Sequence, residues 1–438
     1  MNATAGGRGG TTIRVDYLTR VEGEGGIHIR MKGNHVQDVK IHLFEPPRLF
    51  EAFLRGRSYE EVPDITARIC GICPVAYQMS SVHALERALG VAVHPMVRLL
   101  RRLFYCAEWI ESHALHIYLL NAPDFFGYPD ALRMAAAQEL RGAVERALRL
   151  KKIGNRLVSV LGGREIHPVS VAVGGFYRVP SQAELRACAE DLKWALDAAL
   201  ETVRLTGALP FPDFEDDYEF VALSHPGEYA MNEGRLVSNR GLNIDVEEYE
   251  DHFLEQHVKH STSLHSVIRE RGSYLVGPLA RFNLNYQQLP ESAREAAREC
   301  GLAAPCLNPF KGIAVRSVEL VFACDEALRL IGEYEPPPRP RVAVKPRAGR
   351  GEAVTEAPRG SLYHRYALDD KGLVLSAKIV PPTSQNLKRM EDDLWRYVPR
   401  IAAEPVEEIT RRCEMAVRNY DPCISCSVHA LRASVDRE

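Results

Sequence analysis

Two pairs of cysteines have the spacing that predicts chemistry most directly. Cys70 and Cys73 form one Cys-x-x-Cys pair, and Cys423 and Cys426 form another, close to the end of the chain. Each pair can direct two thiolates at one metal ion, and two pairs together make a four-sulfur site. Because the pairs lie near opposite ends of the sequence, the intervening chain must fold so as to bring them together.

The spacing alone does not identify the metal. A structural zinc ion, an iron–sulfur cluster and a catalytic soft metal all accept four thiolate ligands. The other cysteines are isolated from one another in the sequence, and we interpret them as small buried hydrophobic residues. They are Cys106, Cys188, Cys300, Cys306, Cys324 and Cys413.

The composition is that of an ordinary globular protein. Of the 438 residues, 46% are hydrophobic and 26% are charged, and the formal net charge is -3. This charge gives no basis for predicting a nucleic-acid partner or a polybasic membrane contact. Residues 1–10 do not resemble a signal peptide, and no apolar run approaches the length that spans a membrane. We therefore expect a cytoplasmic protein with reduced thiols.

Helical periodicity dominates the middle of the sequence. Apolar residues recur at helical spacing over residues 95–120 and 131–161, and Ser181 with Glu184 predicts a capping box at the start of a third helix. Residues 12–44 instead alternate apolar and polar side chains, which predicts an antiparallel sheet of about three strands. We therefore expect an α+β fold that is predominantly helical, with a long central helix bundle, a small N-terminal antiparallel sheet and peripheral sheet segments.

Further elements are expected around the bundle. Residues 80–89 predict a helix that a glycine closes, and residues 220–244 predict an insertion that carries a small sheet. A hairpin is expected over residues 362–380, and two helices, at 385–397 and 406–420, lead into the second cysteine pair.

We expect a single domain over residues 12–429. Its parts are the N-terminal sheet, a helical core and a C-terminal metal-binding part, preceded by a flexible N-terminus and followed by a short extension. In order, the flexible N-terminus, sheet, core, metal-binding part and extension span residues 1–11, 12–44, 80–210, 350–429 and 430–438.

Five segments form motifs that belong together. Residues 68–74 read Arg-Ile-Cys-Gly-Ile-Cys-Pro, and residues 421–429 read Asp-Pro-Cys-Ile-Ser-Cys-Ser-Val-His. Between and before them lie Arg-Val-Glu-Gly at 20–23, Ala-Pro-Arg-Gly-Ser-Leu-Tyr-His at 357–364 and Val-Pro-Pro-Thr at 380–383. In this order, and over nearly the whole chain, the segments resemble the large, catalytic subunits of nickel–iron hydrogenases, in particular the cytosolic NAD(P)-linked and sulfhydrogenase alpha types.

The resemblance implies a nickel–iron centre on the four cysteines. Cys70 and Cys423 would be terminal ligands of nickel, whereas Cys73 and Cys426 would bridge nickel to an iron atom that carries carbon monoxide and cyanide. Soft thiolates suit nickel in changing oxidation states. The activity implied is the reversible, heterolytic oxidation of dihydrogen.

The resemblance also assigns roles to residues around the cysteines. Glu22 would accept the proton, since a carboxylate beside a buried metal–thiolate cluster can act as a relay. Arg359 would extend into the cavity above the metals, where Asp421 would hold it by a charge-assisted hydrogen bond. Contacts with the carbon monoxide and cyanide ligands would come from Val380, Pro381 and Thr383.

A second metal site and a processing step are implied near the end of the chain. Glu51 and His429 would bind a structural magnesium ion, although a histidine ligand is atypical for so hard a cation. The mature chain would end at His429, after a processing protease removes residues 430–438. Charged residues in that tail could not be buried beside the metals without a cost.

Departures from the family pattern refine the type of enzyme. Tyr77, Ser112 and Glu24 stand where hydrogenases often have histidine, aspartate and histidine, and we interpret these differences as favouring the cytosolic, bidirectional type. His113 and His116 could form half of a metal site by their spacing. We interpret them instead as buried packing residues.

No flavin or nicotinamide site and no ferredoxin-like run of cysteines is visible in the sequence. Electrons would therefore leave through a separate iron–sulfur small subunit, and then through a flavin-containing diaphorase and further iron–sulfur subunits to NAD(P) or a similar carrier. Some such assemblies also reduce polysulfide. Maturation chaperones are further expected partners. The alternatives are a catalytically inactive hydrogenase-like subunit, which would lack the four cysteines, and a structural zinc protein.

Overall fold

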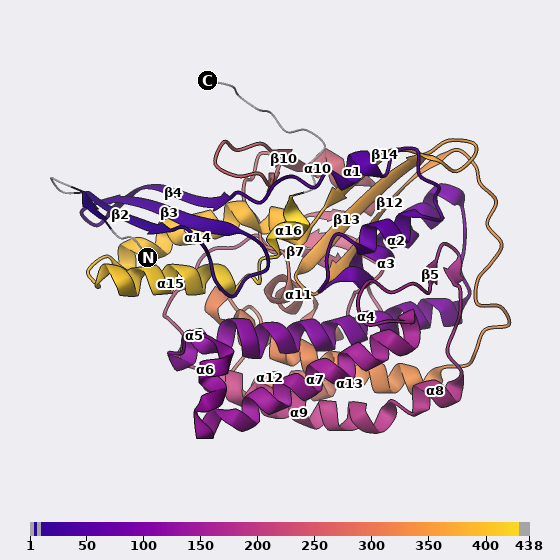
Figure 1. The fold of residues 1–438 in the computed structure, drawn as a ribbon, viewed down its shortest axis with the longest axis horizontal. Coiled ribbons are helices and arrows are strands. Elements are labelled where there is room, and N and C mark those ends of the chain that lie inside the picture. Colours follow the sequence, from indigo (N-terminus) through magenta and orange to yellow (C-terminus); the bar gives the residue numbers. More distant parts are fainter. Residues whose placement is uncertain (1–3, 7–9, 429–438) are drawn as a thin grey trace.

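The computed structural model describes residues 4–6 and 10–428 of the chain. The lower layer in Figure 1 is a bundle of long helices that lie side by side. It consists of α4 (Pro95–Leu115), α7 (Gln138–Gly162), α9 (Ala189–Gly207) and α13 (Gly312–Glu333). Helix α4 packs against α7 and α13, and α13 also packs against α9. The sheets and the helices of the C-terminal part form the upper layer.

Two of the expected long helices are interrupted. The helix expected over residues 131–161 is α6 (Ala131–Ala136) followed by α7, because Ala137 between them has an extended backbone with ψ 123°. The helix expected over residues 95–120 is α-helical only to Leu115. It continues as the π-helical turn η1 (His116–Asn121).

Helix α3 (Pro74–Leu89) begins six residues earlier than residue 80, directly after Cys73. Proline is tolerated in the first helical turn, where its missing N–H has no intrahelical partner to lose. The expected glycine closes the helix: Gly90 has φ 65°. The packing of α3 requires another glycine, because a Cβ on Gly351 would lie 2.2 Å from the carbonyl oxygen of Ala84. Strand β12 (Gly349–Ala357) can therefore lie directly against the helix.

The predicted capping box is present, with the Ser181 side chain accepting the N–H of Glu184. It caps the short helix α8 (Gln182–Arg186), and α9 follows after a break. The insertion expected over residues 220–244 also carries its small sheet. The three strands are antiparallel, in the order β7 (Val221–Ser224), β8 (Arg235–Ser238) and β9 (Asn243–Ile244).

The N-terminal sheet has four described strands where about three were expected. They pair antiparallel in sequence order, and the first lies within residues 1–11. In Figure 1 this sheet extends to the left, over the helices of the C-terminal part. Its strands are β1 (Thr4–Gly6), β2 (Gly10–Val15), β3 (Gly25–Lys32) and β4 (His35–Leu43).

The C-terminal part contains the predicted hairpin, formed by β13 (Gly360–Leu368) and β14 (Val374–Val380). Strand β12 pairs with β13 and makes a three-stranded sheet, and this strand was not predicted. Three helices follow, and the first of them packs against β4. They are α14 (Pro382–Ile401), α15 (Val406–Arg418) and α16 (Ile424–Ser427).

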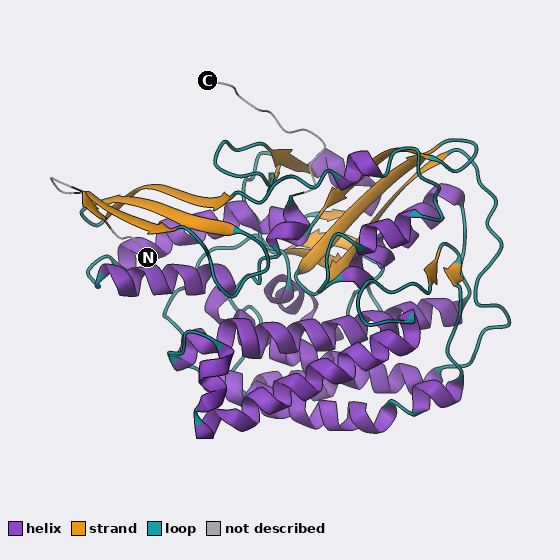
Figure 2. Cartoon of the chain, in the orientation of Figure 1, coloured by secondary structure: helices purple, strands orange, loops and turns teal. Residues whose placement is uncertain are grey.

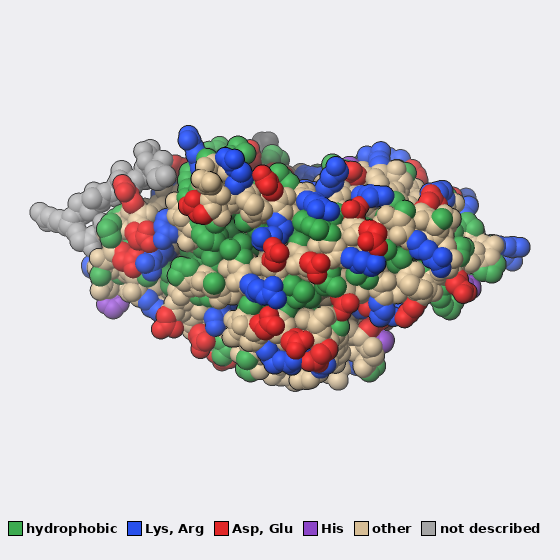
Figure 3. Space-filling model, turned by 90° about the horizontal axis from the view of Figure 1, so that it is seen from below, with side chains coloured by type: hydrophobic (Ala, Val, Ile, Leu, Met, Phe, Trp, Pro, Cys, Tyr) green, Lys and Arg blue, Asp and Glu red, His purple; other side chains and the backbone are tan. Residues whose placement is uncertain are grey.

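Short helices and strands connect these larger elements (Figure 2). The predicted α+β fold, predominantly helical, is confirmed. None of the described helices is long and apolar enough to cross a membrane. Positive and negative side chains are interspersed across the face formed by the bundle (Figure 3). The division into a single domain stays a prediction. The short elements are α1 (Phe50–Phe53), α2 (Val62–Ala67), α5 (Ala122–Phe126), α10 (Tyr249–His252), α11 (Pro278–Asn285), α12 (Glu291–Glu299), β5 (Val171–Ala172), β6 (Gly175–Phe176), β10 (Phe253–Gln256) and β11 (His265–Ile268), with single 3-10 turns at η2 (Val246–Glu248), η3 (Tyr286–Gln288) and η4 (Pro309–Lys311).

Candidate metal centre

The fold brings the two cysteine pairs together in the interior. The sulfur atoms of Cys70 and Cys423 lie 3.6 Å apart, those of Cys73 and Cys426 lie 4.0 Å apart, and those of Cys423 and Cys426 lie 2.7 Å apart. All four side chains are buried. The sequence prediction that these residues form one cluster therefore agrees with the geometry.

The upstream cysteines are fixed at the start of helix α3. Cys73 is the residue that precedes its first turn, and the backbone N–H groups of Ile72 and Cys73 point to the sulfur of Cys70 at 3.3 and 3.2 Å. Glu108 on α4 accepts the N–H groups of Val75 and Ala76 at 2.7 and 3.1 Å. A buried carboxylate thus satisfies the free N–H groups of this helix end. Sequence analysis missed Glu108.

The downstream cysteines are held by a strand-like contact with the N-terminal region. Glu22 pairs in parallel with Cys423, and the N–H of Ile424 donates to the carbonyl oxygen of Glu22 at 2.9 Å. Gly23 has φ 88°, and a Cβ there would lie 2.7 Å from Cβ of Ile424. Only glycine allows this close approach, which explains why it follows Glu22.

The carboxylate of Glu22 lies at the cysteine cluster. Its Oε2 accepts the thiol of Cys423 at 3.0 Å and the N–H of Ser425 at 3.0 Å. This is the contact that a proton acceptor beside a metal-bound sulfur requires.

Arg359 and Asp421 form a buried ion pair next to the cysteines. Nε of Arg359 donates to the backbone oxygen of Asp421 at 2.8 Å, and Nη2 donates to Oδ1 at 3.2 Å. Burial opposes the charge of Arg359, but Asp421 and the cysteine thiolates hold its pKa above the ordinary range. Nη1 of Arg359 is buried and has no hydrogen-bond partner within the described chain. One N–H group of a fixed cation therefore remains for another partner.

A second buried arginine supports this ion pair, and sequence analysis did not identify it. Arg281 on α11 donates to the backbone oxygens of Ala357 and Pro358, the two residues before Arg359, at 2.8 and 3.0 Å. The carboxylates of Glu319 and Glu356 neutralise it, at 2.7 and 3.0 Å. The only sequence signal was an arginine within the apolar run of α11. Its partners are far away in the sequence.

The residues predicted to contact the ligands of iron lie around the start of α14. Oγ1 of Thr383 accepts the backbone N–H of Cys423 at 3.0 Å. Pro381 precedes the first helical residue, and the backbone oxygen of Val380 accepts Nε2 of Gln385 at 3.2 Å. Thr383 is therefore a direct support of the cysteine segment.

Glu51 is buried, and its Oε1 accepts the backbone N–H of Ile379 at 2.8 Å. Burial raises the pKa of Glu51 to about 7. Its predicted partner, His429, lies outside the described residues. The preceding residue, Val428, accepts the backbone N–H of Arg48 at 2.5 Å, so the described chain ends close to helix α1, which carries Glu51.

The side chain of Arg48 connects the two cysteine segments. Its Nη1 donates to the carbonyl oxygens of Ile69 and Ser425, at 2.7 and 3.1 Å. These residues directly precede Cys70 and Cys426.

The two helix histidines make separate contacts. Nε2 of His113 lies 3.0 Å from Oε2 of Glu319, and Nε2 of His116 lies 2.8 Å from the backbone oxygen of Arg418. Both rings are buried, in agreement with their interpretation as packing residues.

The donor set fits a nickel–iron centre. Four buried sulfurs converge, a carboxylate contacts one of them, and a guanidinium with an unpaired N–H group lies beside them. Soft thiolate ligands favour nickel and iron over hard cations.

Comparison with known proteins agrees with this geometry. The chain matches the nickel-dependent hydrogenase family over residues 48–146 and 270–429. It is 34% identical to sulfhydrogenase 1 subunit alpha of Pyrococcus furiosus over 424 residues, which cover 96% of this chain and 98% of that one. It is 28% identical to the NAD-reducing hydrogenase HoxS subunit beta of Cupriavidus necator, over 95% of this chain and 94% of that one.

A solved structure has the same fold. A chain of an NAD+-reducing [NiFe]-hydrogenase in the H2-reduced state superimposes with a TM-score of 0.87 and 25% identity, covering 98% of this chain and 100% of that one. The alternatives of an inactive relative or a structural zinc protein are not favoured. The chain therefore belongs to the nickel-dependent hydrogenase family, and it is the catalytic subunit of a nickel–iron hydrogenase, an oxidoreductase that acts on hydrogen.

Proposed function

We propose that Cys70, Cys73, Cys423 and Cys426 hold the nickel–iron centre, with Cys70 and Cys423 as terminal nickel ligands and Cys73 and Cys426 as bridging ligands. The observation that carries this proposal is the convergence of the four buried sulfurs. When bound, the centre supplies the site at which dihydrogen is split or formed. Carbon monoxide and cyanide on the iron belong to the proposal, as the family resemblance implies.

Glu22 is the proposed proton acceptor. Its Oε2 already contacts the thiol of Cys423 at 3.0 Å, so a proton that leaves this sulfur has an acceptor within hydrogen-bond reach. The N–H of Ser425 fixes the same oxygen. The carboxylate therefore cannot turn away from the sulfur without losing a second hydrogen bond.

Arg359 is the proposed cation of the site, and Asp421 orients it. Two contacts to Asp421 fix the plane of the guanidinium, and Nη1 has no other partner in the described chain. A fixed N–H donor in a dry site can polarise a small bound molecule without reorganising. Val380, Pro381 and Thr383 are proposed to surround the ligands of iron.

Glu51 and His429 are proposed to bind a structural magnesium ion. The buried carboxylate of Glu51 and the hydrogen bond that holds Val428 at Arg48, close to helix α1, support this proposal. We also propose that maturation chaperones deliver the metals. A processing protease then removes residues 430–438.

The electrons require other subunits. Hydrogenase large subunits work with a small iron–sulfur subunit, and we propose that electrons pass from there through a flavin-containing diaphorase and further iron–sulfur subunits to NAD(P). The NAD-reducing relative supports this route. The sulfhydrogenase relative supports polysulfide as an additional acceptor of the complete assembly. A cytoplasmic location stays a prediction from the sequence.

Metal analysis of the anaerobically purified enzyme tests the central proposal. One binuclear centre on four thiolates should give about one nickel per chain, and about one iron per chain in addition to the iron of the iron–sulfur subunits. Zinc alone in an active preparation would contradict it. Intact-mass measurement of the same preparation tests processing, because a full-length chain with bound nickel and normal turnover would exclude removal of the tail.

A further inference from the structure

A second group of metal-binding side chains lies away from the cysteines. His260 comes from the loop between β10 and β11, His265 is the first residue of β11, and Glu391 lies on α14. One ligand atom from each residue lies within 4.8 Å of the other two. No role in the hydrogenase centre accounts for this group.

Glu391 is the centre of the group, and its two oxygens are divided between the histidines. Oε1 lies 2.8 Å from Nε2 of His260, and Oε2 lies 3.8 Å from Nδ1 of His265. The backbone N–H of Ile41 on β4 also donates to Oε1, at 3.0 Å. A backbone hydrogen bond that orients a carboxylate ligand is the usual support of a protein metal site.

His265 has an unsatisfied hydrogen-bonding requirement. Its side chain is 2% exposed, and its Nε2 has no hydrogen-bond partner within the described chain. Its Nδ1 is too far from Glu391, at 3.8 Å, for a hydrogen bond. A metal ion beside Glu391 would therefore bind Nδ1, the nitrogen that faces the carboxylate, with the ring proton on Nε2.

The distances are compatible with a bound ion. Zinc binds imidazole nitrogen and carboxylate oxygen at about 2.0–2.2 Å, so its tetrahedral ligands lie roughly 3.3 Å from one another. The observed separations of 2.8 and 3.8 Å fall on either side of this value. The two rings are nearly perpendicular, at 84° with centroids 5.5 Å apart, so they approach the carboxylate from different directions.

We propose that His260, His265 and Glu391 form a site for a divalent transition-metal ion, with Zn2+ as the ion that best suits two imidazoles and one carboxylate. Three protein ligands leave one coordination position for water or another side chain. Hard cations such as Mg2+ do not favour such a nitrogen-rich set.

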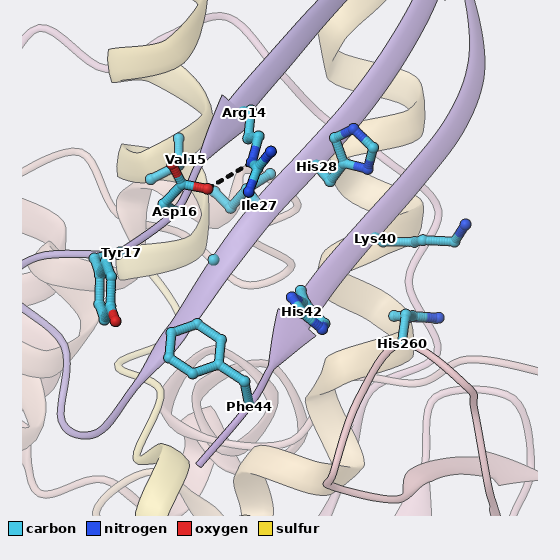
Figure 4. A pocket seen from close by; sticks show the side chains of 11 residues that line it. Arg14, Val15, Asp16, Tyr17, Ile27, His28, Lys40, His42, Phe44 and His260 are labelled. Carbon is cyan, nitrogen blue, oxygen red and sulfur yellow. Dashed lines mark hydrogen bonds and ion pairs between the residues drawn. The ribbon is translucent and has the colours of Figure 1, made fainter. Parts of the chain in front are cut away.

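The site can be reached from the surface. His260 is partly exposed and lines a cavity of about 620 Å³ over β2, β3 and β4 (Figure 4). His42 and Lys40 on β4 line the same cavity. The cavity gives an ion a path to His260.

The site would join three parts of the molecule. Glu391 belongs to α14, Ile41 belongs to β4, and the histidines belong to the β10–β11 segment. Helix α14 also carries Thr383, which holds the backbone of Cys423. An ion at Glu391 would therefore fix the helix that supports the downstream cysteines. The site would be structural for the hydrogenase centre, with no part in the reaction.

The test uses the complete enzyme with its nickel and iron in place, so that the cysteines are occupied. After treatment with a chelator, equimolar Zn2+ is added and the bound zinc is measured after dialysis. We expect about one zinc per chain, and X-ray absorption at the zinc edge should show nitrogen and oxygen neighbours at about 2.0–2.1 Å without sulfur at about 2.3 Å. A sulfur shell, or no retained zinc, would overturn the proposal.

Variants locate the ion. His265→Ala and Glu391→Gln each remove a proposed ligand and should lower zinc affinity by at least roughly 100-fold, more than the loss of a residue that only supports a ligand. Gln can still accept the N–H of Ile41. His28→Ala is the matched control, because His28 lines the same cavity outside the proposed set. An equal loss of zinc affinity in His28→Ala, or unchanged zinc affinity in both His265→Ala and Glu391→Gln, would contradict the proposed ligands.

A second readout covers variants that fold poorly. His260→Ala replaces a partly exposed ligand and should leave the fold intact. Zn2+ should raise the Tm of the wild-type enzyme and of His28→Ala but not that of His260→Ala. A Tm rise of wild-type size in His260→Ala would show that zinc binds elsewhere. Hydrogen-dependent dye reduction by the same samples separates this result from the hydrogenase proposal.

Discussion

The upstream cysteines precede a long buried helix, whereas Cys423 precedes, and Cys426 lies within, the four-residue helix α16. Cys73 is fixed by α3, whose first N–H groups are bonded by Glu108. Cys423 depends on contacts from elsewhere in the chain, namely Glu22 and Thr383. The upstream half is therefore part of the helical core, and the downstream half is positioned by tertiary contacts. This arrangement suits a site in which the last segment docks after the rest has folded.

The largest effect is expected where both halves must contribute a sulfur. Cys73→Ser and Cys426→Ser should each abolish hydrogen-dependent dye reduction, because a hydroxyl cannot replace a soft bridging thiolate. Cys300→Ser should retain nearly full activity, since this half-buried thiol donates to the backbone oxygen of Val203, as a hydroxyl also can. Full activity in either bridging variant would place the centre elsewhere.

Glu22→Gln separates the chemical role of the downstream half from its structural role. Gln can keep the hydrogen bond from Ser425 but cannot accept a proton. We expect nickel and iron to be retained while most hydrogen–deuterium exchange is lost, roughly 10²-fold or more. Exchange at the wild-type rate would remove Glu22 from the proton path. Glu24→Gln, two residues away, is the matched control.

Arg281→Lys tests the support of Arg359, which belongs to neither half. Lysine keeps the positive charge between Glu319 and Glu356 but cannot hold two backbone oxygens with one planar group. We expect turnover to fall about 10- to 100-fold with metal content unchanged. Arg298→Lys, at an exposed arginine, is the control. Wild-type turnover in Arg281→Lys would show that the hydrogen bonds of Arg281 do not position Arg359.

Glu111 on α4 gives the helical core a pH dependence of its own. Burial raises the pKa of Glu111 from 4.5 to about 7, although Lys151 partly opposes this. Between pH 4.5 and pH 7, Glu111 therefore holds a proton in the folded chain but has lost it in the unfolded chain. The contribution to the free energy of unfolding is therefore complete below pH 4.5 and is lost as the pH rises through 7, by up to about 3 kcal/mol.

Glu111→Gln should flatten this dependence, because its amide does not titrate. The free energy of unfolding of both proteins, measured by denaturant titration from pH 4.5 to pH 8, provides the comparison. Parallel pH profiles would show that Glu111 is ionised in the folded enzyme.

The smallest effect is expected from a single hydrogen bond of the downstream half. Thr383→Val removes the acceptor for the N–H of Cys423 and should cost about 1 kcal/mol, seen as faster nickel loss to a chelator. Thr383→Ser retains the hydroxyl and should behave like the wild type. If Val and Ser variants release nickel equally slowly, α14 does not hold the cysteine segment through this bond.

Local signals predicted much of the fold. Gly90 ended its helix, Ser181 formed its capping box and the hairpin of β13 and β14 formed where expected. Strand β12 was missed because most of its residues are buried, so it shows no alternation of apolar and polar side chains. The break at Ala137 has no proline or glycine to mark it.

The candidate site was predictable only where motifs carry it. The cysteines, Glu22 and Arg359 lie in recognisable segments, and the structure brings these side chains together. Glu108 and Arg281 lie in ordinary helices, and their partners are distant in the sequence. Long-range pairing of buried charges leaves no local pattern, and these supports appear only once the chain is folded.

Arg48 has a consequence for how tightly the site can bind metal. By bonding the carbonyl oxygens before Cys70 and Cys426, it holds two segments close together that are remote in the sequence. Contacts within the chain thus offset much of the entropy cost of bringing the two segments together before any metal–sulfur bond forms. The thiolates of one segment then face those of the other at a high effective concentration. Arg48 therefore contributes to the chelate effect of a centre that it does not touch.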